Sequence, residues 1–466
     1  MTYESNMKAI KLKYCDIYKA IQEVKLDKKK YGVVKTKIGT PTLKIKEKDR
    51  FFFLHSKYDP LKEAKSFAKG NIDISKKNYI VYGAGFFYHI TEFLEQHKDA
   101  NLYLFETNKY ILKTAIENIN IVEIIQNPKI YIIFEEDIYR LLMKFHEVLG
   151  LNNKKLIIHM PSLNTIPKGL EEFKYILEDH IMKENTIRKF SDLLDENFLF
   201  NINRFDFNVD ILFNKFKNLP AIIVSAGPSL DKNREALKFA KDKALILCVG
   251  RAVKSLVEIG IRPDAIIITD PQDFVYSSQL KGLNIDIPII ILSTCDKKVS
   301  RNYRGIKFIA LQRGYSPSEI YAENNNHHLV ETGGSVATAA LDTVIKFGCN
   351  PIVFVGQDLA YTDWKTHADS AVSNKVIKNK ELRIVKDING DIVYTSKSFH
   401  MFLKWFENRI RREKKITFID ATEGGARIEG TEIMTLKDVI DNILINHKRP
   451  FNKIFEEVKN EIGKFE

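Results

Sequence analysis

The sequence predicts an α/β protein with three parts: a Rossmann-like domain over residues 1–215, a central doubly wound α/β domain over residues 216–434, and a short helical segment over residues 435–466. Three observations support this prediction. A strand, a glycine turn and a helix follow one another from residue 78, short apolar runs alternate with helical patterns from residue 221, and the chain ends in amphipathic helices. Alternating strands and helices favour a mostly parallel sheet covered by helices.

The N-terminal domain begins with a basic helix and short strand candidates, followed by the run Asn78-Tyr-Ile-Val-Tyr-Gly-Ala-Gly-Phe-Phe-Tyr-His89. An amphipathic helix and a strand over 102–106 come next, so Glu106 stands where a Rossmann fold places its ribose-binding acid. Tyr88 occupies the position of the third glycine of the dinucleotide fingerprint. This partial pattern predicts a Rossmann-like unit and leaves nucleotide binding at Gly83-x-Gly85 open.

The remainder of this domain contains two more strand candidates, over 130–134 and 155–159, and a helical stretch over 170–200. The connection at 208–218 then leads into the central domain. A domain boundary is therefore predicted within that connection.

The central domain is predicted from short, β-prone apolar runs separated by helical patterns at 233–241, 252–259 and 335–347. Polar residues cluster after these runs, where open α/β sheets bind ligands. The polar, lysine-rich stretch 363–391 is expected to be a long insertion. The strand candidates are Ala221–Val224, Ala244–Val249, Ala265–Thr269, Pro288–Leu292, Lys307–Leu311, Ile352–Val355 and Ile416–Ile419.

The composition is that of a soluble globular protein, with 44% hydrophobic and 28% charged residues among 466. The four cysteines are far apart, so neither a disulfide framework nor a metal site is predicted. We recognise no secretory signal and no membrane-spanning apolar run, and therefore expect a cytoplasmic protein without a membrane partner. The net charge of +12 suits an anionic ligand or an acidic protein. No zinc finger or RNP pattern is present, so nucleic acid is not an expected partner, and the oligomeric state is left open.

The first candidate site is a glycine turn between the strand at 221–224 and a helix. Glycine permits a ligand to approach the backbone closely, and proline fixes the turn. We expect Ser229 and Asp231 to cap the helix, whose free N-terminal amides would then attract a phosphate or carboxylate. An ordinary strand-to-helix turn is the alternative. The turn residues are Ser225, Ala226, Gly227, Pro228 and Ser229.

The second candidate site is a pair of acids, Asp270 and Asp273, directly after the strand at 265–269. Such carboxylates can bind ribose hydroxyls, hold a metal ion or accept a proton. The alternative is that they only cap the loop after the strand.

The third candidate site is the run Thr332-Gly333-Gly334-Ser335, which precedes a clear helix. Ser335 is expected to cap this helix, and the small residues would admit a second anionic group at its start. Close packing of the helix against the sheet is the alternative.

The fourth candidate site follows the strand at 352–355 and consists of Gln357, Asp358, Tyr361 and His367. His367 is a candidate acid or base because it lies close to this strand end in sequence. The chain has neither a P-loop nor a nucleophile elbow, which disfavours a P-loop NTPase and an α/β-hydrolase. We expect the four sites to converge on one crevice that binds a phosphorylated group and lets it leave.

Several ordered runs within about residues 215–445 carry a resemblance: SAGPSLDKN, RAVKSLVEIGIRPDAIIITDPQD, ETGGSVATAALDTVIKFGCNPIVFVGQDLAYTD, KTHAD and ATEGGARIEGTE. Together they resemble the motility-associated factor family of bacterial flagellin glycosyltransferases. FLHSKYDPLKEA and the Gly83-x-Gly85 unit resemble that family's N-terminal region more weakly.

The resemblance implies transfer of a nonulosonic acid, of pseudaminic or legionaminic type, from its CMP-activated form to Ser or Thr of flagellin, in support of flagellum assembly and motility. It implies no tightly bound cofactor and leaves a divalent metal open. The turns at Gly227 and Gly333 would hold the anionic groups of the donor, and His367, Asp358 or Asp270 would be the general base.

The central domain is also similar to bacterial sialyltransferases, whose nucleotide turn is close to N-G-P-S. Ala226 replaces that Asn here, so a contact from its side chain cannot be carried over.

Two other functions remain open. The central domain is similar to the 6-hydroxymethylpterin diphosphokinase MptE-like domain, so a diphosphokinase that uses ATP is one alternative. Asp270, Asp273 and Asp358 would then be available to hold Mg²⁺. The other alternative is a non-catalytic, flagellin-binding assembly factor.

Overall fold

The computed structural model describes residues 2–47, 50–361, 367–368, 382–445, 451, 453–455 and 457. The chain forms two compact units, Met1–Ile181 and Met182–Glu466, which we describe separately. No helix in the described part of the chain is long and apolar enough to cross a membrane. The predicted boundaries near residues 215 and 434 stay predictions.

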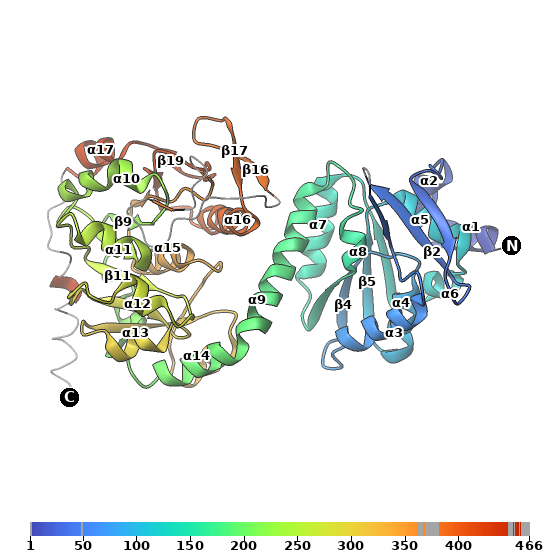
Figure 1. Ribbon diagram of the computed structural model, residues 1–466, viewed down its shortest axis with the longest axis horizontal. Helices are drawn as coiled ribbons and strands as arrows, with labels where there is room; N and C mark the ends of the chain where they lie inside the picture. The colour runs from blue at the N-terminus through green and yellow to red at the C-terminus, as the bar shows by residue number, and fades with distance from the viewer. Residues whose placement is uncertain are drawn as a thin grey trace. The chain divides into compact units, whose positions relative to one another are not determined.

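Unit 1 contains a four-stranded parallel sheet of order β6-β5-β4-β7 and a separate antiparallel sheet, β1-β2-β3 (Figure 1). The chain builds the parallel sheet outward from β4 in one direction and then returns to the other side of β4 for β7. This reversal creates a topological switch point between β4 and β7. The elements are α1 (Thr2–Lys13), α2 (Cys15–Gln22), β1 (Tyr31–Lys35), β2 (Pro41–Glu47), β3 (Arg50–Phe53), α3 (Pro60–Asn71), β4 (Asn78–Tyr82), α4 (Tyr88–Gln96), β5 (Asn101–Glu106), α5 (Lys109–Asn118), α6 (Val122–Gln126), β6 (Ile130–Phe134), α7 (Ile138–Leu149), β7 (Lys154–Ile158) and α8 (Met160–Leu163), after which α9 (Glu171–Asn201) begins.

Unit 2 contains a ten-stranded sheet whose main path is β14-β13-β12-β11-β10-β9-β15-β18-β19, with β8 paired to β13, and every strand pairing in it is parallel. Its order reverses between β9 and β15, which makes a second switch point. The elements are β8 (Phe207–Asn208), η1 (Val209–Leu212), β9 (Ala221–Val224), α10 (Leu230–Asn233), η2 (Arg234–Phe239), β10 (Leu245–Val249), α11 (Gly250–Val257), β11 (Ala265–Ile268), α12 (Val275–Gln279), β12 (Ile289–Leu292), α13 (Lys297–Asn302), β13 (Lys307–Gln312), α14 (Ser316–Asn324), β14 (Leu329–Val330), α15 (Val336–Lys346), β15 (Ile352–Val355), β16 (Arg383–Lys386), β17 (Ile392–Thr395), α16 (Lys397–Arg411), β18 (Phe418–Asp420), β19 (Glu432–Ile433), α17 (Leu436–Asp438) and η4 (Val439–Ile443).

The central strands of unit 2 are apolar along their whole length because helices cover both faces of the sheet. Every residue of β9, β10, β11, β12 and β15 is buried. Helix α15 returns the chain across the sheet from β14 to β15, opposite to the direction of the earlier connections. Right-handed crossovers therefore place α15 on the other face from α10, α11 and α12.

The structure confirms the predicted α/β class, the doubly wound central sheet and the helix at 170–200. The helix predicted over 233–241 is wrong in type, because the one turn of α10 gives way to the 3₁₀ segment η2. The strand predicted at 416–419 begins two residues later, as β18. Most of the predicted insertion 363–391 lies outside the described residues, although β16 pairs with β17 as a hairpin at its end.

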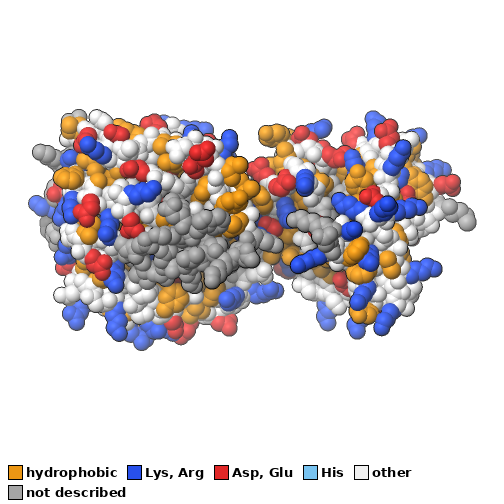
Figure 2. All heavy atoms as spheres, turned by 45° about the horizontal axis from the view of Figure 1, so that its top comes forward, with side chains coloured by type: hydrophobic (Ala, Val, Ile, Leu, Met, Phe, Trp, Pro, Cys, Tyr) orange, Lys and Arg blue, Asp and Glu red, His pale blue; other side chains and the backbone are white. Residues whose placement is uncertain are grey.

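The positive charge does not gather in one place on the face drawn in Figure 2. Lys and Arg side chains are scattered there among Asp and Glu side chains. The net charge of +12 therefore gives no single basic surface on this face.

Candidate functional site at the β9–β15 switch point

The glycine turn after β9 packs directly against the end of β15. The Gly227 N–H donates to the carbonyl of Gly356 (2.8 Å). A Cβ at Gly227 would overlap both that carbonyl oxygen and Oδ2 of Asp358. Only glycine fits at this position, and the reason is contact with the protein itself.

Asp358 ties three segments together at the switch point. Its carboxylate accepts hydrogen bonds from Ser229 Oγ (2.7 Å) and Ser229 N–H (3.2 Å), and its carbonyl accepts from Ala426 N–H (2.7 Å). A Cβ at Gly425 would overlap the Asp358 backbone. Asp358 is only 2% exposed, so its geometry fits a positioning role better than the predicted role of general base.

The predicted open helix end after the β9 turn is wrong. The Ser229 side chain makes no capping hydrogen bond to α10, because it donates to Asp358 instead. The N–H groups of Gly227 and Ser229 are both used within the protein. An anion at this turn therefore needs a positive partner other than these two amides.

Two polar side chains line the same strand ends. Ser225 Oγ donates to Gln357 Oε1 (2.5 Å), and the Gln357 N–H donates to Thr422 Oγ1 (3.2 Å). Ser225 and Gln357 are 5% and 6% exposed. The structure thus brings the first and fourth predicted clusters together.

His367 belongs to this site and is paired with a residue that the sequence analysis missed. The Ala368 N–H donates to the carbonyl of Ala226 (3.0 Å), which fixes His367 beside the β9 turn. Arg251 Nη1 lies 3.4 Å from His367 Nε2. Burial, and secondarily the charge of Arg251, lowers the pKa of His367 to about 4, so the imidazole is neutral at pH 7.

Arg251 lies in the first turn of α11, directly after β10, which is the neighbour of β9. Its place follows from the same rule that predicted the other clusters: it comes just after a buried strand. The predicted helix began at residue 252, so Arg251 fell just outside it, although a cation at a helix start is an unusual choice.

The loop after β18 is the other missed part of the site. Asp420 ends that strand, and its Oδ1 accepts from Thr422 N–H (3.0 Å). Burial, with a smaller contribution from Asp358, raises the pKa of Asp420 to about 6 against the opposing bonds of Thr422. The following Gly424 is placed so that a Cβ there would contact Ser229.

The second predicted cluster lies after β11, two strands from β9. Asp270 is half-buried, and its Oδ1 accepts from the Gln272 N–H (3.0 Å). Asp273 is exposed and forms an ion pair with Lys298 (3.6 Å). Asp270 thus lies at the same edge of the sheet as the β9 turn, whereas the Asp273 side chain forms an ion pair at the surface.

The third predicted cluster lies after β14, also at the carboxyl edge of the sheet. Ser335 caps α15 as predicted, and Thr338 completes the capping box. The Gly333 N–H donates to Thr338 Oγ1 (2.9 Å), and the Gly334 N–H donates to Thr332 Oγ1 (3.3 Å). These amides, like those of the β9 turn, are used internally.

Helix α16 covers the Gly333 turn and also reaches the fourth cluster. A Cβ at Gly333 would overlap the Trp405 ring, and Phe402 lies beside Gly334. On the same helix, the Phe399 ring lies 5.6 Å from the Tyr361 ring, centroid to centroid. The prediction that the two glycine turns face each other across one open crevice stays a prediction, because α16 packs on one of them.

The Gly83-x-Gly85 turn of unit 1 is filled by protein side chains. A Cβ at Gly85 would overlap His55, and a Cβ at Gly83 would overlap Ser162. Glu106 is fully buried and accepts from the N–H groups of Ala84, Thr107 and Asn108. In this arrangement Glu106 is not available to a ribose, and a pyrophosphate has no room at the turn.

Comparison with known proteins gives a family match and similarity to solved structures. Residues 196–364 match the family described as 6-hydroxymethylpterin diphosphokinase MptE-like. Among solved structures, the chain is similar to a MAf glycosyltransferase from Magnetospirillum magneticum AMB-1, with a TM-score of 0.47 and 15% identity over 98% of this chain and 80% of that chain. No curated protein sequence matches significantly. The matched segment includes the β9 turn, Arg251 and Asp358, and it ends just before His367.

Proposed function

We propose that this protein, which carries an MptE-like domain over residues 196–364, is a glycosyltransferase that binds its nucleotide-sugar donor at the β9–β15 switch point. The proposed donor is a CMP-activated nonulosonic acid and the proposed acceptor a Ser or Thr hydroxyl of flagellin, which are the substrates that the sequence resemblance implies. The observation that carries the proposal is the pairing of Arg251 with a neutral His367 beside the β9 turn.

Arg251 fits the role of phosphate ligand. A guanidinium group offers a planar fork of donors that matches a phosphate or carboxylate, and it stays charged at any working pH. The N–H groups of Gly227 and Ser229 are already used, so the phosphate of the donor needs a side-chain cation such as Arg251. The same charge would stabilise CMP as it leaves.

His367 fits the role of general base. When Arg251 turns to the donor phosphate, Nε2 of His367 is released from its present hydrogen bond and one of the two causes of its low pKa is removed. The acceptor oxygen bonds to the anomeric carbon while the bond from that carbon to the phosphate oxygen breaks. CMP leaves with the electron pair, and the hydroxyl proton passes to Nε2. A general base of this kind contributes about 10²–10⁴-fold.

Asp358 fits the role of a positioning residue. It holds Ser229 and the β18 loop in place against β15 and makes its contacts with protein groups. The Ser225–Gln357 pair offers a hydroxyl and an amide at the same edge for orientation of the sugar or the base.

The first experiment measures nucleotide binding by calorimetry. Wild-type protein is expected to bind CMP and CDP, Arg251→Gln to bind them at least tenfold more weakly, and His367→Gln to bind them normally. Arg262→Gln is the matched control, because Arg262 forms an exposed pair with Asp286 and lies outside the site. Normal cytidine nucleotide binding by Arg251→Gln would remove the proposed phosphate ligand.

The second experiment measures the intact mass of flagellin co-expressed with the protein and a nonulosonate pathway. Wild-type protein is expected to add whole sugar units to flagellin. His367→Gln is expected to lower the initial rate of this addition by about 10²–10⁴-fold. Unmodified flagellin with the wild-type protein, together with flagellin binding and no cytidine nucleotide binding, would favour a non-catalytic role in flagellin binding.

A diphosphokinase is the second candidate function, because the matching family is described by that activity. Asp270 lies half-buried at the carboxyl edge and is the acid best placed to hold Mg²⁺. Binding of ATP with Mg²⁺, and not of CMP or CDP, would favour this function over glycosyl transfer.

A further inference from the structure

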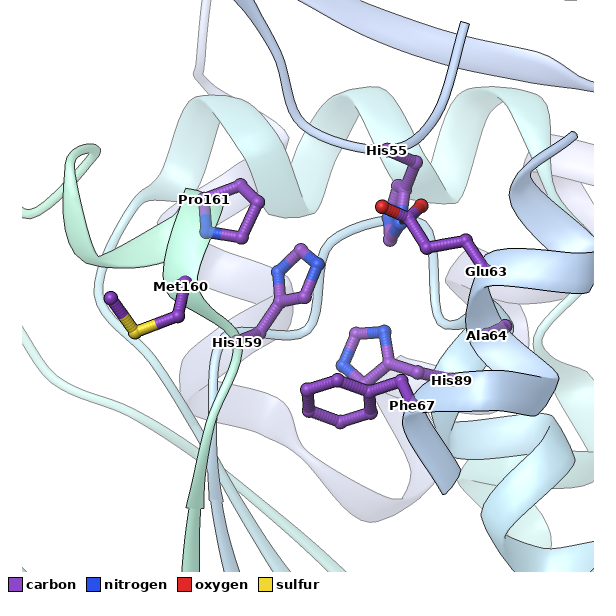
Figure 3. Close-up of a pocket in the computed structure, with 8 residues that line it drawn as sticks. All are labelled: His55, Glu63, Ala64, Phe67, His89, His159, Met160 and Pro161. Carbon is purple, nitrogen blue, oxygen red and sulfur yellow. Dashed lines mark ion pairs between the residues drawn. The ribbon is translucent and has the colours of Figure 1, made fainter. Parts of the chain in front are cut away.

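Unit 1 brings three histidines from distant parts of the chain to its own switch point. His55 follows β3, His89 lies in the first turn of α4, and His159 directly follows β7. All three are buried, and one ring nitrogen of each lies within 4.8 Å of the others. Figure 3 shows the rings of His89 and His159 next to each other, with the Glu63 carboxylate beside His55.

We propose that His55, His89 and His159 form a binding site for one divalent late first-row transition-metal ion of the Zn²⁺ class. Neutral imidazole nitrogens are the ligands that such ions prefer. Burial lowers the pKa of His89 to about 3 and holds the pKa of His159 well below its usual range, so both rings are neutral at pH 7.

The hydrogen bonds of His89 indicate which of its ring nitrogens has a lone pair for a metal ion. Its Nε2 lies 2.9 Å from the carbonyl of Gly83, which can only accept, so Nε2 carries the proton. Nδ1 is therefore unprotonated, and it is buried with no hydrogen-bond partner among the described residues. An unsatisfied buried acceptor is unfavourable, and a bond from Nδ1 to a metal ion would offset that cost. Donation of the second ring N–H to a carbonyl is also the usual support of a metal-bound histidine.

His159 also has a ring nitrogen left for an ion, whereas His55 must exchange a hydrogen bond to bind one. His159 Nδ1 lies 2.8 Å from Ser162 Oγ, which leaves Nε2 for an ion. His55 Nδ1 faces Glu63 Oε2 at 3.7 Å, the outer carboxylate that often accompanies a metal-binding histidine. His55 Nε2 now accepts from the Phe86 N–H (2.8 Å), so a metal ion would replace that donor.

The site must tighten when it binds an ion. Metal–nitrogen bonds of about 2.0–2.1 Å in a tetrahedral site put the nitrogens about 3.4 Å apart, so the rings must move by roughly 1 Å. A cavity of about 120 Å³ adjoins the cluster and is lined in part by Glu63, Phe67 and Met160. Three protein ligands and this space leave a fourth coordination position for water or another small ligand.

The decisive experiment uses tag-free, full-length protein treated with a chelator and then titrated with Zn²⁺. We expect one Zn²⁺ per chain, and X-ray absorption of the loaded protein should show imidazole nitrogens at about 2.0–2.1 Å and no sulfur ligand. Co²⁺ should give the strong visible absorption of a four-coordinate ion.

The variants identify the ligands. His89→Gln and His159→Gln should each weaken Zn²⁺ binding by more than 100-fold, and Glu63→Gln should weaken it by about 10–100-fold as an outer-shell change. His146→Gln, on the exposed side of α7, is the matched control and should bind Zn²⁺ normally. If a histidine variant fails to fold, Glu63→Gln and the X-ray absorption of the wild type still decide the question. Folded wild-type protein that binds no more Zn²⁺ or Co²⁺ than the triple His55→Gln, His89→Gln, His159→Gln variant would overturn the proposal.

Discussion

The two units use the same topology at their candidate sites and place different chemistry there. In each parallel sheet the strand order reverses beside one strand, β4 in unit 1 and β9 in unit 2, and a glycine turn follows that strand. In unit 1 the turn is surrounded by imidazole rings. In unit 2 it is surrounded by hydroxyl, amide, carboxylate and guanidinium groups. If both proposed sites bind ligands, the backbone topology sets where a ligand can bind and a few side chains set which ligand it is.

Each of the two turns also has its own buried carboxylate. Glu106 accepts three backbone N–H groups around the turn of unit 1, and Asp358 accepts from the backbone and side chain of Ser229 in unit 2. Each acid takes donors that a bound phosphate would otherwise use. The comparison therefore predicts that the backbone of each turn does not bind the ligand. It predicts that the ligand binds to side chains that the turn holds in place.

The largest expected effect comes from filling the β9 turn. Gly227→Ala would place a methyl group against Asp358 and the Gly356 carbonyl, which cannot move without breaking the β9–β15 contact. We expect a loss of about 3 kcal/mol or more in the free energy of unfolding and no detectable cytidine nucleotide binding. Chemical denaturation and calorimetry measure both.

The matched control is Gly70→Ala in α3, where no heavy atom lies within reach of the added methyl group. This change should stabilise the protein by about 0.5–1 kcal/mol. A mild effect of Gly227→Ala, similar in size to that of the control, would contradict the tight packing of the turn.

The next effect separates the two buried carboxylates. Asp358→Asn and Glu106→Gln should each cost about 1.5–3 kcal/mol in the free energy of unfolding, because buried hydrogen bonds to a charged acceptor are weakened. Only Asp358→Asn should also reduce glycosyl transfer, since Asp358 positions the turn beside His367. Equal losses of transfer in both variants would mean that the sites of the two units are not independent.

The last prediction is an effect that is absent at neutral pH, namely a pH dependence of stability at the unit 2 site. The folded protein holds the pKa of His367 near 4, whereas the ring has an ordinary value of 6.5, so the unfolded chain takes up the proton first. The contribution of His367 to stability is therefore complete above pH 6.5 and is lost as the pH falls from 6.5 to 4. Thermal unfolding of His367→Gln should change less across this window than that of the wild type. Parallel curves for the two proteins would contradict the burial of a neutral His367.

The sequence predicted the sheets well because their signal is local. The apolar runs at Ala221–Val224 and Ile352–Val355 need no partner to be recognised, and Ser335 before an apolar helix is a local capping signal. The role of Asp358 could not be predicted in this way, because it depends on β15 pairing with β9 across 130 residues of chain.

The missed residues have the same explanation. His55, His89 and His159 follow three different elements and have no metal-ligand spacing in the sequence, so only the fold brings them together. Arg251 and His367 meet because the segment after β15 returns to Ala226 through a backbone hydrogen bond. The expected helix cap at Ser229 failed for the opposite reason: a local preference lost to a long-range bond with Asp358.

The bond between Asp358 and Ser229 has a consequence for turnover. The Asp358 carboxylate competes with a bound phosphate for the Ser229 donors. Because it belongs to the same chain, it acts at an effective concentration of roughly millimolar or more. A nucleotide that accepts a hydrogen bond from the Ser229 N–H would have to displace the Asp358 carboxylate. The carboxylate would form this hydrogen bond again when the nucleotide leaves. If the proposed donor binds here, this arrangement would favour weak binding of the product and its rapid release before the next donor binds.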